Sequence, residues 1–148
     1  MGAADSEAKR RGDDCMEILR ILPKEELIRI IVDDAKNWLA HDGLWFQAVE
    51  NMHGMEQAIK ADAMSWEKFT VIEAKRIMER LGMAPGGGLN ALGECLKRRF
   101  YARLNSQKFE ILNEKKAVFH MLDCRVQAAR KREGLPAFPC KSVGLVEY

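Results

Sequence analysis

Two cysteines, Cys124 and Cys140, stand where short amphipathic helices are predicted to begin. The N-terminus of a helix lowers the pKa of a thiol, which makes the thiolate a better nucleophile and a better metal ligand. Arg125 directly follows Cys124 and strengthens this effect. Fifteen residues separate the two cysteines, and this spacing is too loose to specify a zinc site by itself. Two alternatives therefore stay open, a metal site that takes zinc and a pair of buried structural thiols.

Three carboxylates on apolar helix faces form a second group of candidates. Glu50 follows the apolar run 44–49, and Asp62 lies within a long helical pattern. Glu73 comes four residues after Phe69, so the two side chains share one side of a helix. Buried carboxylates have shifted pKa values and are enriched at functional sites. The alternative is that these acids mark the boundary between core and solvent.

Aromatic and polar residues together define a candidate small-molecule site. Such sites have apolar walls and a few polar groups that orient the ligand. We expect the site between the long helix and a small sheet, where Glu50, Glu73 and Arg125 would orient the ligand. The predicted ligand-binding residues are Trp45, Glu50, Trp66, Phe69, Glu73, His120 and Arg125.

The segment 97–132 is strongly basic, with eleven lysines and arginines against three acids. Such asymmetry can favour an anionic partner. The segment has no recognised nucleic-acid motif, so we predict a solvated basic face and no nucleic-acid partner. The glycines at 86–88 follow no strand and precede no lysine at the phosphate-loop spacing, which indicates a flexible connector.

Hydrophobic periodicity predicts an α+β fold with a mostly helical N-terminal two-thirds. The predicted helices cover residues 24–40, 44–52, 55–81 and 89–99, and His41, Asp42 and Gly43 are expected to break the first from the second. Alternating residues around a polar turn predict an antiparallel hairpin at about 107–122. Short helices follow from Cys124 and Cys140.

Length and composition set the expected organisation of the chain. Its 148 residues fit one domain, which we place at 15–148 after a disordered leader at 1–14. The four cysteines form no C-x-x-C pair, and no apolar stretch is long enough to span a membrane. We therefore predict a cytoplasmic protein with reduced thiols. The unpaired edge of the hairpin predicts a homodimer.

Three stretches carry a resemblance to a known family: LWFQAVENMHGMEQAIKADAMSWEKF, IEAKRIMERLGM and DCRVQAARKREGLPAFPCKSVGLVEY. They resemble an uncharacterised family of prokaryotic cytosolic proteins. That family is similar to L-2-amino-thiazoline-4-carboxylic acid hydrolase-like proteins and, more distantly, to vinyl-reductase-type small-molecule-binding domains. The resemblance covers residues 21–148 and is most specific from Asp123 to Lys141.

The resemblance implies a fold and a site. Its members have a helical N-terminal part and an antiparallel sheet, and their helices enclose a ligand pocket. In that pattern two further strands follow the C-terminal helix. Cysteines on those strands, with the equivalents of Cys124 and Cys140, would make a metal site. Because this chain ends at Tyr148, we expect those strands to be missing and the metal site within one chain to be incomplete.

Three functions compete at this point. The first is a small-molecule-binding or sensory domain. The second is a hydrolase of a small carbon–nitrogen compound that uses a metal-bound water or a thiolate at Cys124, with a carboxylate as base. The third is a structural protein that forms a homodimer without a ligand. The residues leave open whether the protein is an enzyme, and the catalytic residues of the hydrolase branch are not placed on this chain.

Overall fold

The computed structural model describes residues 16–148. The predicted leader at 1–14 and Cys15 lie outside the described residues. The chain divides into two units, Met1–Asp34 and Ala35–Tyr148, and each is described by itself. The prediction of a single domain over 15–148 stays a prediction.

In the first unit, Pro23 separates two helical segments. Residues 16–21 are helical, and helix α2 (Lys24–His53) begins directly after the proline. The carbonyl of Pro23 accepts hydrogen bonds from the amides of Glu26 (2.9 Å) and Leu27 (3.1 Å). Acids in the first turn of α2 complement the positive end of the helix dipole, which explains why the helix begins here.

Helix α2 is continuous, so the predicted break at His41, Asp42 and Gly43 is wrong. An interior glycine costs a helix only about 1 kcal/mol relative to alanine. The aromatic side chains on either side of the glycine pack against distant parts of the chain. Trp38 stacks on Phe69 with ring centroids 5.4 Å apart, and Phe46 meets Phe138 at 5.1 Å. Tertiary packing therefore keeps α2 continuous at Gly43.

Helix α3 (Met55–Leu81) has the bounds that the sequence predicts. Gly54 (φ 83°) precedes it and Gly82 (φ 62°) ends it, and both have backbone angles that favour glycine. The Gly82 amide donates to the carbonyl of Glu79, and the Met83 amide donates to that of Met78. These bonds satisfy carbonyl groups that the helix end leaves free.

The predicted hairpin is confirmed as strands β1 (Gln107–Asn113) and β2 (Lys116–Met121), which pair antiparallel. Phe109 pairs with Phe119 on its apolar face, and the ring of Phe109 lies against Gly93 of helix α4 (Gly88–Leu96). The polar face carries an ion pair between Lys108 and Glu110 at 2.7 Å. The hairpin therefore packs on α4 through one face only.

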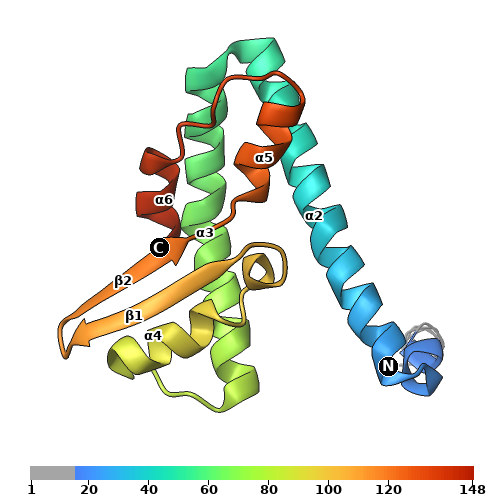
Figure 1. The fold of residues 1–148 in the computed structure, drawn as a ribbon, viewed down its shortest axis with the longest axis vertical. Coiled ribbons are helices and arrows are strands. Elements are labelled where there is room, and N and C mark those ends of the chain that lie inside the picture. Colours follow the sequence, from blue (N-terminus) through green and yellow to red (C-terminus); the bar gives the residue numbers. More distant parts are fainter. Residues whose placement is uncertain (1–15) are drawn as a thin grey trace, which may run out of the picture. The chain divides into compact units, whose positions relative to one another are not determined.

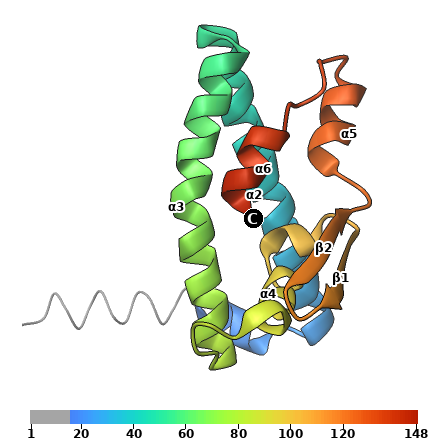
Figure 2. The ribbon, with the colours of Figure 1, turned by 90° about the vertical axis from the view of Figure 1, so that its left-hand side faces the viewer.

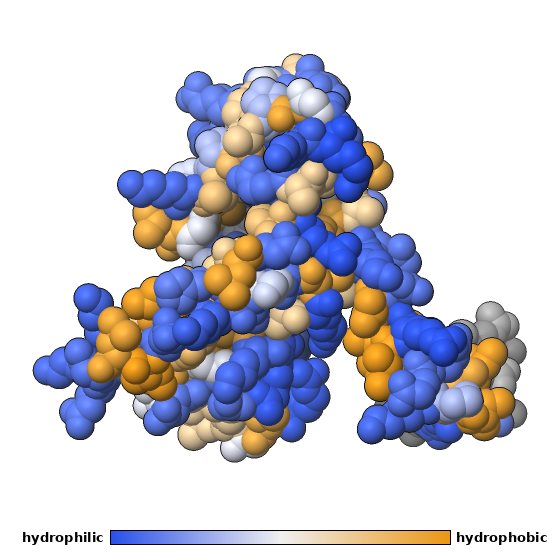
Figure 3. Space-filling model, in the orientation of Figure 1, coloured by the Kyte–Doolittle hydropathy of each residue, from blue (hydrophilic) through white to orange (hydrophobic). Residues whose placement is uncertain are grey.

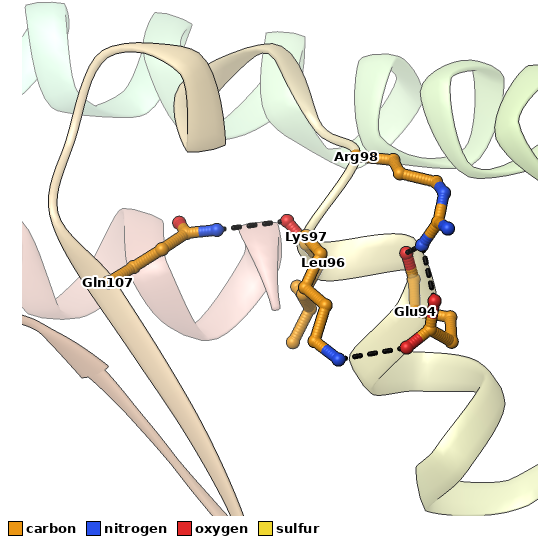
Figure 4. A network of polar contacts seen from close by, with 5 residues as sticks. All are labelled: Glu94, Leu96, Lys97, Arg98 and Gln107. Carbon is orange, nitrogen blue, oxygen red and sulfur yellow. Dashed lines mark hydrogen bonds and ion pairs between the residues drawn. The ribbon is translucent and has the colours of Figure 1, made fainter.

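A polar network fixes the end of α4 beside the start of the hairpin (Figure 4). Glu94 forms an ion pair with Lys97 at 2.8 Å and a second, closer one with Arg98. The side-chain amide of Gln107 donates to the carbonyl of Leu96 at 3.0 Å. These contacts hold both ends of the segment that contains Arg99 and the short 3-10 helix η1 (Phe100–Arg103).

Two short helices complete the second unit, α5 (Arg125–Arg132) and α6 (Lys141–Glu147). Asn105 accepts a hydrogen bond from the first amide of α5 at 3.0 Å, so the cap comes from outside the helix. Figures 1 and 2 show α6 beside α3. The fold is therefore α+β, with helices packed on a small antiparallel sheet.

Apolar side chains also reach the surface. On the face drawn in Figure 3, apolar residues gather over the tip of the hairpin, where Ile111 and Leu112 are exposed. Among the described residues, no helix combines the length and the apolar character that crossing a membrane requires.

Candidate functional site

The core of the second unit is centred on five aromatic rings. Trp66 is only 4% exposed, and its ring lies 5.5 Å from Tyr101 and 6.3 Å from Phe100. Trp38 reaches the same group from α2 and remains 36% exposed. We call this group the aromatic cluster; it consists of Trp38, Trp66, Phe69, Phe100 and Tyr101.

Arg99 is a buried cation at the edge of the aromatic cluster. Its Nε donates to Oε2 of Glu73 at 2.8 Å, and Oε1 of the same carboxylate accepts from the Phe100 amide. Its guanidinium lies 5.6 Å from the ring centre of Trp66. Burial would lower the pKa of Arg99, but the bond to Glu73 and the charge of Glu147 outweigh it and raise the pKa. The guanidinium therefore stays charged inside the protein.

The end of the chain supplies the second partner of Arg99. Nη2 of Arg99 and Oε1 of Glu147 are 2.9 Å apart, and both atoms are buried. Tyr148 covers the guanidinium, with its ring centre 4.8 Å away. The pKa of Glu147 is raised because burial outweighs the attraction of Arg99. Helix α6 thus places a carboxylate that is costly to ionise against the cluster.

Two further acids interact electrostatically with each other and with Tyr101, and we call them the acidic pair, Asp42 and Asp62. Burial and the nearby charges of Asp42 and Glu147 raise the pKa of Asp62 to about 7. Burial likewise raises the pKa of Asp42. Burial and the charges of Asp42, Glu147 and Asp62 also raise the pKa of Tyr101. The charges of the acidic pair and of Glu147 therefore all act on the buried hydroxyl of Tyr101.

A second buried arginine neutralises Glu50. Arg130 holds this carboxylate through two bonds, at 2.7 and 2.9 Å, and its own side chain is only 4% exposed. Its Nε donates to the carbonyl of Pro136 at 2.6 Å. Hydrogen bonding from Arg130 lowers the pKa of Glu50. Glu50 and Glu73 are thus each matched by a buried arginine, whereas no ion pair to Asp42 or Asp62 occurs within residues 16–148.

The predicted ligand-binding residues lie in different parts of the second unit. Trp66, Phe69 and Glu73 come together at the aromatic cluster, as their helical spacing predicts. Trp45 is 65% exposed on α2, and Glu50 is bound by Arg130. Their roles toward a ligand stay predictions.

The remaining two predicted residues lie near the sheet. His120 stands on the polar face of the hairpin, with Nε2 3.2 Å from Glu110. Arg125 donates from Nε to the carbonyl of Leu104 at 2.9 Å. Both side chains have partners within the protein, and their roles in binding stay predictions.

The thiols Cys124 and Cys140 each precede a helix, as the sequence predicts. Cys124 is half-buried, Cys140 is exposed, and both are free. Across the described part of the chain, no three metal-binding side chains gather around one point. The zinc site and the thiol-dependent hydrolase stay predictions.

Sequence reasoning missed several residues of this region. The sequence pattern predicts a helix break at Asp42 and a solvated basic face around Arg99. Trp38 and Asp42 are four residues apart, and so are Asp62 and Trp66. Residues four apart lie on the same side of a helix, so this repeated pairing of an acid with a tryptophan is a signal in the sequence that could have pointed to both acids. The partners of Arg99 have no local signal because Glu73 and Glu147 are distant in the chain.

Comparison with known proteins gives one match. No curated protein and no solved structure matches the chain. The likeness to hydrolase-like and vinyl-reductase-type proteins therefore stays a prediction. A family described as a family of unknown function (DUF6125) matches residues 20–148. Because the match covers most of its length, the chain belongs to the DUF6125 family.

Proposed function

We propose that this protein is a small-molecule-binding domain that takes a small organic cation at the acidic pair, against the aromatic cluster. The observation that carries the proposal is the contrast among the acids of α2 and α3. Glu50 and Glu73 each have a buried arginine, while Asp42 and Asp62 have no ion-pair partner among the described residues. A cationic ligand would supply the missing positive charge.

Electrostatics supports a positive charge at this position. Burying a carboxylate without a cation is costly. Burial raises the pKa of Asp62 and outweighs a side-chain hydrogen bond with Trp66 that lowers it, so the group holds a proton. A cation beside a carboxylate favours its ionised form and lowers its pKa. The binding of a cation therefore releases a proton from Asp62 near neutral pH.

The aromatic rings support the same ligand class. The faces of tryptophan and tyrosine attract cations, with an interaction of about 0.5–2 kcal/mol that grows as water is excluded. Trp38 is partly exposed beside the buried Trp66, so one ring is open to solvent while the other lies in the core. An aromatic amine or amidine would place its charge on the acidic pair and its ring on these faces.

A thermal-shift comparison tests the proposal. Benzylamine and benzyl alcohol differ in charge but little in shape, and so do benzamidine and benzamide. We expect the two cations to raise the melting temperature and the two neutral analogues to leave it unchanged. A ligand at a hundredfold its Kd adds about 2.7 kcal/mol of stability. Equal shifts for cation and neutral analogue would contradict the proposal.

Two variants test whether the thermal shift arises from binding at the acidic pair. The double variant Asp42→Asn, Asp62→Asn removes the charge of the acidic pair and should abolish the shift with benzylamine. Glu114→Gln, in the exposed turn of the hairpin, is the matched control and should keep the shift. A shift that survives in the double variant would place the ligand elsewhere.

We also propose that the protein forms a homodimer through the hairpin. The described residues contain a sheet of two strands only, so each strand has an outer edge without a partner strand. Unpaired edges favour pairing with another chain. Leu112 and Leu122 are 56% and 64% exposed beside these edges. Light scattering after size exclusion should give twice the chain mass, and a monomer at micromolar concentration would contradict the homodimer.

A further inference from the structure

One side of helix α2 is exposed, apolar and free of acidic and basic residues. No exposed residue in the range 37–52 is an aspartate, glutamate, lysine or arginine. Leu44, Trp45 and Met52 are 66%, 65% and 66% exposed, and contact with water makes such apolar surface unfavourable. We call this surface the uncharged face; it consists of His41, Leu44, Trp45, Ala48 and Met52.

The uncharged face lies on one side of the helix. Trp45, Ala48 and Met52 follow one another at intervals of three and four residues, which places them on the same side. The opposite side of α2 packs inside the second unit, where the ring of Phe46 meets that of Phe138 at 5.1 Å. Helix α2 therefore has one side in the core and a second apolar side that the described residues leave exposed.

Helix α3 shows that long helices of this protein need not have such a face. Eight of its exposed residues are charged, including Lys60, Glu67 and Lys75. Protein interfaces, in contrast, are depleted in charged residues and enriched in tryptophan and methionine. The composition of the uncharged face therefore fits a contact with another protein surface, and tryptophans such as Trp45 are the residues that most often dominate binding energy.

The surface that covers the uncharged face must itself lack charge, because burying a charge without a partner is costly. The exposed tip of the hairpin does not meet this condition, since Leu112 is followed closely by Glu114 and Lys115. The uncharged face of a second copy does meet it. When two α2 helices lie antiparallel, Trp45 of each copy can lie on the partner's Ala48, so a large ring fills the space above a small side chain at two equivalent places.

We propose that the uncharged face of α2 is a contact with a second copy of this chain, in which the two α2 helices lie antiparallel around a two-fold axis between Trp45 and Ala48. The contact needs neither the ligand nor the hairpin, so it goes beyond the proposed function. Residues 41–52 span only about 18 Å of helix. Because small interfaces bind weakly, we expect the contact at protein concentrations above the micromolar range in which the hairpin homodimer is tested.

Sedimentation equilibrium of a hairpin variant isolates this contact. Leu112→Lys together with Leu122→Lys places charges beside the strand edges that we propose for the homodimer. We expect this hairpin variant to pass from one chain to two as its concentration rises from about 10 µM to about 1 mM. A hairpin variant that stays a single chain throughout would overturn the α2 contact. A dimeric wild type under the same conditions would then leave the hairpin homodimer in place.

A matched pair of substitutions in the hairpin variant locates the contact. Ala48→Lys puts a charge at the centre of the uncharged face and should weaken self-association by about tenfold or more. Ala61→Lys is the control, because Ala61 is likewise an exposed alanine within a helix, and it should leave self-association unchanged. Equal self-association of the two would overturn the contact. A single chain that instead binds phosphatidylcholine vesicles would also overturn it and would assign the face to a membrane surface.

Discussion

Arg130 and Glu50 form a two-bond ion pair that joins α5 to α2, with Nη1 2.7 Å and Nη2 2.9 Å from the carboxylate oxygens. The arginine also donates to the carbonyl of Pro136 and lies over the ring of Phe46, 5.9 Å from its centre. One side chain thus connects α2, α5 and the segment that leads to α6. The pair therefore helps to hold these three parts of the second unit together.

Arg130→Ala should destabilise the protein strongly, because it leaves Glu50 partly buried without its cation. Removing one partner of a buried pair costs about 3–5 kcal/mol. Urea unfolding measures the loss. Arg132→Ala removes an arginine whose side chain is 73% exposed and should change stability by less than about 0.5 kcal/mol. Equal effects of the two substitutions would show that the Arg130 pair contributes nothing.

The stability of the protein should fall as the pH rises toward neutrality, because of Asp62. Its pKa is about 7 in the folded state and 3.8 as the ordinary value, so the folded state holds the proton more tightly. The resulting stability is present below the ordinary pKa and is lost as the pH rises through about 7.

Asp62→Asn isolates this contribution. Because the group is partly exposed, we expect the variant to gain about 1–2 kcal/mol at alkaline pH relative to the wild type. The difference between the two proteins should shrink toward acid pH. Unfolding curves across the pH range measure it, and a difference that does not change with pH would contradict the raised pKa.

Alanine substitutions at two glycines within helices should change the stability of the protein in opposite directions. A Cβ at Gly93 would lie 2.8 Å from the ring of Phe109, whereas a Cβ at Gly43 meets nothing within 4 Å. Gly93→Ala should destabilise by about 1–3 kcal/mol because the hairpin must move away from α4. Gly43→Ala should stabilise α2 by roughly 0.5–1 kcal/mol. Thermal unfolding of both variants measures the contrast, and a gain in both would disprove the packing of Phe109 on Gly93.

Replacing Gln127 should destabilise the protein more than replacing an ordinary exposed glutamine. Its side chain donates to the carbonyl of Phe138 at 2.7 Å and accepts from the amide of the same residue at 3.0 Å. Gln127→Ala leaves both backbone groups without this partner and should cost about 1–2 kcal/mol. Gln47→Ala, which loses one exposed bond to Glu133, serves as the comparison. Similar denaturant midpoints for the two variants would argue against the Phe138 bonds.

Local signals explain which parts of the fold the sequence predicts. Gly54 and Gly82 adopt positive φ at both ends of α3, so the glycine pattern alone places that helix. The hairpin follows from alternation around a polar turn. The break expected at Gly43 failed because the cost of one glycine is local, whereas the packing of Trp38 and Phe46 depends on residues far along the chain.

The candidate site was predictable only in part, for the same reason. Trp66, Phe69 and Glu73 share a face of one helix, and their grouping follows from spacing. Arg99 lies among basic residues and is distinguished only by its distant partners Glu73 and Glu147. No pattern in a single sequence connects these positions.

Proton release on cation binding tests the proposed site most directly. Titration calorimetry with benzylamine at about pH 7, near the pKa of Asp62, should show the same binding in two buffers but heats that differ with the buffer's ionisation enthalpy. That difference should vanish in Asp62→Asn. Saturable binding without proton release, or no binding of benzylamine by the wild type, would contradict a cation site at Asp42 and Asp62.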